Sequence, residues 1–130
     1  MDMKFYRCNV CGKIVANVKE SDSSLICCGE EMKPLIPQTM ETGTEKHQPV
    51  WEMVGNKVYV TVGSIPHPMT EEHHIEWIAV QTKQGNQRKK LEIGTEPRAC
   101  FALCHGDEVE AVYAFCNLHM LWKAKEGAIK

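Results

Sequence analysis

The sequence is notable first for what it does not contain. None of its apolar runs approaches the roughly 18 residues of a membrane-spanning helix. Neither charge sign dominates, since 15 basic and 17 acidic residues leave a formal net charge of −2. We therefore expect neither a membrane protein nor a nucleic-acid-binding protein. The opening stretch MDMKFYRCNV lacks the apolar core of a secretion signal, which indicates a cytoplasmic protein.

Cysteine and histidine are abundant and unevenly distributed. Four of the seven cysteines lie in residues 1–36, a segment without histidine, whereas the other three cysteines and all six histidines follow residue 46. In a reducing compartment, closely spaced cysteines are metal ligands more often than disulfide partners. The two regions are therefore expected to carry different chemistry.

The composition predicts three segments, 1–36, 37–46 and 47–130. A unit of fewer than about 40 residues rarely folds on its core alone, so the first segment needs a metal or disulfide staple. The stretch PLIPQTMETGTEK has two prolines, a glycine and three threonines, and residues 37–46 are interpreted as a connector. The remaining segment is rich in short, strand-like runs.

Those runs predict an all-β fold, in the form of a β-sandwich. Residues 57–62 place Val58, Val60 and Val62 on one face, and 99–104 alternate similarly. Residues 108–116 are expected to place Val109, Ala111, Tyr113 and Phe115 on one face. Residues 73–82 also fit a helical stripe, but their β-branched and aromatic content favours a strand. A last strand is expected within 119–125.

The first segment contains a candidate metal site. Its cysteines follow the pattern Cys8-x2-Cys11, fifteen residues, then Cys27-Cys28, and a glycine follows each pair. Four thiolates complete a tetrahedral set for zinc or for a single iron. Because neighbouring side chains normally diverge, the adjacent pair requires an irregular backbone. A structural zinc remains an alternative, and two disulfides are a weaker one.

A second candidate site combines residues from four stretches, EKH, PHPM, EEHH and CNLH. The proposed ligands are His47, His67, His73, Cys116 and His119. Five ligands exceed the four of a structural zinc, and several imidazoles with one thiolate suit iron or copper. With the imidazoles in a plane, the thiolate would be axial and the opposite position open to a small ligand.

The other cysteines and histidines receive no role at this site. His74 follows His73, and on a strand it would point to the opposite face. His105 lies in a polar turn and is expected to be exposed, while Cys100 and Cys104 are expected to be spare thiols.

Two rival functions remain open at this point. Cys116, His119 and Met120 fit the ligand loop of a blue-copper electron carrier. Met120, however, directly follows His119, and the other histidines would be superfluous. A zinc-stapled interaction domain explains the four cysteines but not the histidines.

These motifs resemble a known family. EKHQPV, VGSIPHPMTEEHHIEWI and CNLHMLWKA are similar to the C-terminal domain of desulfoferrodoxin, the two-iron superoxide reductase. YRCNVCG and CCGEEM are similar to its desulforedoxin-like N-terminal domain. The family often has an aromatic residue at the position of His74, and residues 83–110 are the least similar part.

The resemblance implies a metal-stapled module followed by an immunoglobulin-like β-sandwich, commonly in a homodimer. One iron would be held by the four N-terminal cysteines, for electron transfer or for structure. A second would have four equatorial histidines and axial Cys116, and would reduce superoxide to hydrogen peroxide with electrons from a rubredoxin-like donor. Lys46 would attract the anion, and Glu45 would occupy the sixth position of the ferric resting state. The amides of Asn117 and Leu118 are expected to donate to the Cys116 sulfur.

Overall fold

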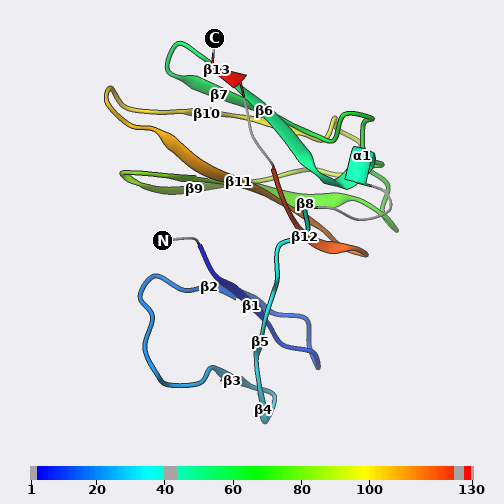
Figure 1. The fold of residues 1–130 in the computed structure, drawn as a ribbon. Coiled ribbons are helices and arrows are strands. Elements are labelled where there is room, and N and C mark those ends of the chain that lie inside the picture. The colour runs from blue at the N-terminus through cyan, green and yellow to red at the C-terminus, as the bar shows by residue number, and fades with distance from the viewer. Residues whose placement is uncertain (1–2, 40–43, 125–127, 130) are drawn as a thin grey trace. The chain divides into compact units, whose positions relative to one another are not determined.

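The computed structural model describes residues 3–39, 44–124 and 128–129, and for 44–45 and 128–129 the backbone alone. The chain divides into two compact units, Met1–Ile36 and Pro37–Lys130 (Figure 1). Residue 38 of the segment interpreted as a connector forms a bridge with Trp122 of the second unit. None of the helices among the described residues has the length and apolar character needed to cross a membrane.

The first unit consists of five very short strands. In a three-stranded sheet, β1 (Phe5–Arg7) lies between β2 (Ile14–Ala16) and β5 (Lys33–Pro34), and both neighbours are antiparallel to it. A separate hairpin pairs β3 (Ile26–Cys27) with β4 (Glu30–Glu31).

The first unit has almost no hydrophobic core. Among its described residues, only Phe5, Cys8 and Met32 are buried. Full burial of an apolar side chain contributes about 1.5–3 kcal/mol, which is small against the entropy cost of ordering more than thirty residues. The unit therefore needs a further source of stability, and its cysteines are placed to supply one by binding metal.

The second unit is a sandwich of two four-stranded sheets (Figure 1). One sheet has the order β10 (Arg98–Ala102), β7 (Lys57–Val62), β6 (Pro49–Val54), β13 (Ala128–Ile129). The other has the order β12 (Met120–Lys123), β11 (Val109–Cys116), β8 (Ile75–Thr82), β9 (Gly85–Lys90). All pairings are antiparallel except that of β13 with β6. A short helical turn, α1 (Thr44–His47), precedes β6.

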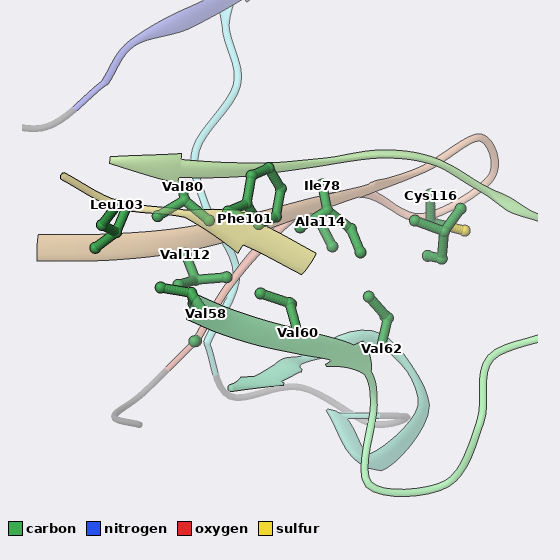
Figure 2. Packing of buried hydrophobic residues seen from close by; sticks show 12 residues of the cluster. Val58, Val60, Val62, Ile78, Val80, Phe101, Leu103, Val112, Ala114 and Cys116 are labelled. Carbon is green, nitrogen blue, oxygen red and sulfur yellow. The ribbon is translucent and has the colours of Figure 1, made fainter. Parts of the chain in front are cut away.

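The core lies between the two sheets. Val58, Val60 and Val62 of β7 point toward β8 and β11, as expected from their alternation, and Cys116 lies at one end of the row (Figure 2). The strand expected within 73–82 is confirmed as β8, and so is the all-β fold class. A rigid hydrophobic core thus ends at a residue proposed to bind metal.

The prediction that Val109 shares a face of its strand with Ala111 and Tyr113 is wrong. The register between β11 and β8 shifts between Val109 and Ala111, so that an extra residue is inserted. Such a bulge reverses the alternation. Val109 consequently packs against the core with Val112 and Ala114, while Ala111 and Tyr113 lie on the other face of the sheet.

Candidate metal centres

The four N-terminal cysteines converge from two loops. Cys8 and Cys11 follow β1, while Cys27 ends β3 and Cys28 lies in the turn to β4. The Cys11 and Cys27 sulfurs are 3.7 Å apart, those of Cys27 and Cys28 are 3.9 Å apart, and all four sulfurs lie within 4.8 Å of one another. Tetrahedral thiolates about 2.3 Å from a metal have sulfur–sulfur edges of about 3.8 Å. The spacing therefore suits one tetrahedral ion.

The backbone at the adjacent pair is irregular, as convergence of two neighbouring side chains requires. Cys28 has a φ of 53°, and Gly29 follows with a φ of 73°. Non-glycine residues rarely adopt this left-handed conformation, and it is found most often where function or tight turns demand it. Here it directs the Cys28 sulfur toward the same point as the Cys27 sulfur.

The thiols of this cluster cannot all ionise together without a cation. The Cys11 amide, which donates to the Cys8 sulfur at 3.5 Å, is the main cause that lowers the pKa of Cys8 to about 6. Hydrogen bonds to the Cys11 and Cys8 sulfurs raise the pKa of Cys28 to about 12. A bound metal supplies the missing positive charge. All seven cysteines are free thiols, and each lies in the described part of the chain.

In the second unit, four imidazoles form a ring of near-perpendicular neighbours. Around the ring, centroid separations are 4.7 Å for His47–His67, 4.5 Å for His67–His73, 5.2 Å for His73–His119 and 4.6 Å for His119–His47. Interplanar angles between these neighbours are 68–79°. Across the ring, His47 and His73 are 5.9 Å apart. Such a pinwheel lets four nitrogens point toward one centre.

A thiol completes the set. Donor atoms of His47, His67, His73 and Cys116 all lie within 4.8 Å of one another. His119 is outside that mutual limit, but its Nδ1 is 2.9 Å from His47 Nε2 and 3.8 Å from the Cys116 sulfur. The structure thus brings together all five residues proposed from the sequence.

Two ring nitrogens have no hydrogen-bond partner among the residues that the structure describes. His67 Nε2 and His73 Nε2 are buried without a hydrogen bond. His67 Nδ1 lies 2.7 Å from the Pro68 carbonyl, to which it can only donate, so Nε2 carries the lone pair. Burial lowers the pKa of His67 to about 4 and also lowers the pKa of His73. Neutral imidazoles with orphaned lone pairs are the form in which histidine binds metal.

Cys116 is fully buried at the end of β11. Burial raises the pKa of its thiol, and the amides of His119 and Leu118 act in the opposite direction by hydrogen bonding to the sulfur. The expectation for Leu118 is thus met, whereas that for Asn117 is wrong, because the Asn117 amide donates to the His74 carbonyl at 3.1 Å. The turn aims two amides, from Leu118 and His119, at the thiolate.

Two supporting residues were not identified from the sequence. Trp122 stacks on the His47 ring at 4.9 Å, and its Nε1 donates to the His119 carbonyl at 3.1 Å. Gln38 Nε2 donates to the same carbonyl at 2.7 Å. Both contacts fix the position of His119. The only signal for Trp122 was its place in the motif CNLHMLWKA, and no sequence signal distinguished Gln38.

The site is closed on one side and open on the other. His47, His67 and Cys116 are buried, whereas His119 and Lys46 are exposed. Lys46 directly precedes His47 in α1, and after burial and the neighbouring histidines its charge also lowers the pKa of His73. The side chain of Glu45 lies outside the described part of the structure.

The residues left without a role from the sequence lie apart from the ligand set. His74 contacts the Thr70 carbonyl through Nδ1 at 2.9 Å. It also lines a separate pocket of about 390 Å³, together with Trp77 and Arg88. Cys100 is half-buried, and Cys104 and His105 are exposed.

The sequence matches two family descriptions that together span most of the chain. Residues 39–125 match "Desulfoferrodoxin", and residues 1–35 match "Desulfoferrodoxin, N-terminal domain". The chain belongs to the desulfoferrodoxin family. A "Desulfoferrodoxin homolog" of Archaeoglobus fulgidus is 48% identical over 122 residues, which cover 94% of this chain and 96% of the relative.

Several relatives carry the name of an enzyme, and two of them illustrate the similarity. The crystal structure of the superoxide reductase from Treponema pallidum superposes with a TM-score of 0.81 at 35% identity, and covers 95% of this chain and 98% of that one. The superoxide reductase of Thermococcus kodakarensis is 36% identical over 110 residues, which cover 68% of this chain and 95% of the relative.

Proposed function

We infer that the protein is a superoxide reductase: superoxide takes up one electron and two protons and leaves as hydrogen peroxide. The observation that carries this function is the ring of four imidazoles with one buried thiol, closed on the Cys116 side and exposed at His119. Relatives with the name superoxide reductase support the same assignment.

The metal proposed for this ring is iron, held by His47, His67, His73, Cys116 and His119. A redox metal with this mixed ligand set supplies the electron that superoxide receives. His67 and His73 would each bind the iron through Nε2, which is buried without a hydrogen bond. Both imidazoles are neutral, and histidine binds metal in its neutral form. Hydrogen bonds from the Leu118 and His119 amides stabilise the charge of the Cys116 thiolate.

Lys46 and Glu45 are proposed to serve the exposed side of the ring. Lys46 is a positive charge at the solvent boundary, where it attracts the anionic substrate and stabilises negative charge that develops on the product. Glu45 precedes it in α1, and its carboxylate is proposed as a further ligand that would bind the iron after it is oxidised.

The four-cysteine cluster is proposed to hold a second iron, for electron transfer or for structure, and the tetrahedral spacing of its sulfurs supports this. The proposed electron donor is a small rubredoxin-like protein, the proposed assembly is a homodimer, and the proposed compartment is the cytoplasm. These three proposals rest on family membership and on the abundance of free thiols.

The four-imidazole ring does not fit the alternative function of a blue-copper electron carrier. Blue-copper sites use two histidines with one cysteine and a weak axial ligand. Here four imidazoles gather around Cys116. The copper reading leaves two of them without a role.

Metal analysis and product counting test the proposal. Protein purified without oxygen should contain two irons per chain, and each superoxide consumed should yield one hydrogen peroxide when a reductant is present. Dismutation would give only half as much peroxide. Copper in place of iron, or the dismutation ratio, would refute the assignment.

A further inference from the structure

Asn117 ties together two loops that carry proposed ligands. Its Nδ2 donates to the Glu72 carbonyl at 3.0 Å, and its Oδ1 accepts from the His74 amide at 2.9 Å. Its own amide donates to the His74 carbonyl at 3.1 Å. One residue thus holds the backbone on both sides of His73. Asn117 itself directly follows Cys116 in the chain.

The side chain is well suited to this contact. A carboxamide holds a donor group (NH2) and an acceptor oxygen in one plane. Here the NH2 group meets the Glu72 carbonyl and the oxygen meets the His74 amide. Aspartate lacks the donor, and alanine lacks both groups. His74 is 43 residues away in sequence, and its hydrogen bonds with Asn117 extend the pairing of β11 with β8, in which Cys116 lies opposite Ile75, up to the loop of His73.

The same contacts decide which amides reach the Cys116 sulfur. Because the Asn117 amide is directed to His74, only the next two amides of the turn, those of Leu118 and His119, hydrogen bond to the thiol. A different orientation of Asn117 would release its amide and alter both the position of His73 and the hydrogen bonding of the sulfur.

We propose that Asn117 is a positioning residue that fixes the His73 imidazole relative to the Cys116 thiolate and so sets metal affinity and thiolate–metal electronic coupling. The inference rests on the proposed metal site but not on the reaction with superoxide. Loss of a residue that orients metal ligands costs about 10–100-fold in metal affinity or activity. We expect a loss of that size for Asn117→Ala.

The test uses the full chain with Co²⁺ as probe, and measures affinity by chelator competition and the thiolate-to-cobalt absorbance. Asn117→Ala removes both side-chain hydrogen bonds. Asn117→Asp has nearly the same shape but faces the Glu72 carbonyl with an oxygen. Asn86→Ala, an exposed asparagine on β9, is the matched control. The four-cysteine cluster, which none of these changes touches, provides an internal spectral reference.

Both Asn117 variants should bind cobalt about 10–100-fold more weakly at the histidine–cysteine site and shift its thiolate absorbance, while Asn86→Ala behaves as wild type. A merely structural residue would lower the unfolding temperature without moving that absorbance. If Asn117→Ala does not fold, the near-isosteric aspartate variant decides the question. Wild-type affinity and absorbance in a folded Asn117 variant would overturn the inference. A wild-type chain that binds no metal through its histidines would overturn the proposed function as well.

Discussion

Acid should destabilise the metal-free second unit, and His67 should be a main cause. Its side chain is 2% exposed, and burial lowers its pKa from 6.5 to about 4. The unfolded chain therefore binds a proton at a higher pH than the folded chain does. It follows that the free energy of unfolding is largest above pH 6.5 and falls as the pH drops toward 4.

The size of this effect follows from the two pKa values. One pKa unit corresponds to about 1.4 kcal/mol, so the neutral, buried imidazole contributes about 2 kcal/mol that is lost by about pH 5, and about 3 kcal/mol that is lost by about pH 4. A domain is stable by only about 5–15 kcal/mol in total. The lowered pKa of His73 acts in the same direction.

Tryptophan fluorescence can follow this unit alone. All three tryptophans, Trp51, Trp77 and Trp122, lie in the second unit, so urea titrations of metal-free protein near pH 7 and about pH 5 report its unfolding free energy. His67→Gln should remove about 2 kcal/mol of the difference between the two conditions, and His105→Gln, at an exposed site, should leave it unchanged. Equal pH dependence in wild type and His67→Gln would show that the reasoning is wrong.

Substitutions at three further positions test the proposed roles of a charged side chain and of two cysteines. Lys46→Ala should slow the encounter with superoxide and weaken its dependence on ionic strength, while Lys46→Arg should retain both; identical pulse-radiolysis rates in all three proteins would reject steering. Cys116→Ser should abolish the thiolate charge-transfer absorbance of the ferric protein, and persistence of that band would mean that another residue supplies the sulfur ligand. Cys11→Ser should remove the iron proposed for the four-cysteine cluster. A stable variant with full turnover from a reduced donor would then assign the N-terminal cluster a structural role, and a loss of turnover would indicate electron transfer.

Much of the architecture could be predicted because it depends on regular patterns. The alternation of Val58, Val60 and Val62 follows directly from the two-residue period of a strand, and the structure places all three in the core. The cysteine pattern similarly depends on short spacings along the chain. These patterns are local, so they can be recognised without knowing the fold.

The supporting contacts could not be predicted, because they are made with backbone groups that every residue possesses. Gln38 donates to the carbonyl of a residue 81 positions away, and nothing in the sequence distinguishes that carbonyl from any other. The bulge after Val109 could not be predicted for a related reason. One extra residue in β11 moves Val109 to the opposite face from Ala111 without changing the composition of the strand. Asn117 was expected to act through its amide on Cys116, and only the partner segment shows that this amide has another acceptor.

The placement of the proposed ligands explains how one site can be rigid at Cys116 and exposed at His119. Cys116 ends a buried strand and lies against the core row that includes Val62, so close packing fixes the sulfur from behind. His119 lies only three residues further along but is exposed, and the hydrogen bonds of Gln38 and Trp122 to its carbonyl replace the core as its support. Hydrogen bonds to the backbone leave the outer side of the imidazole uncovered, whereas hydrophobic packing would have enclosed it. The ring is therefore held by the core at Cys116 and left exposed to solvent at His119.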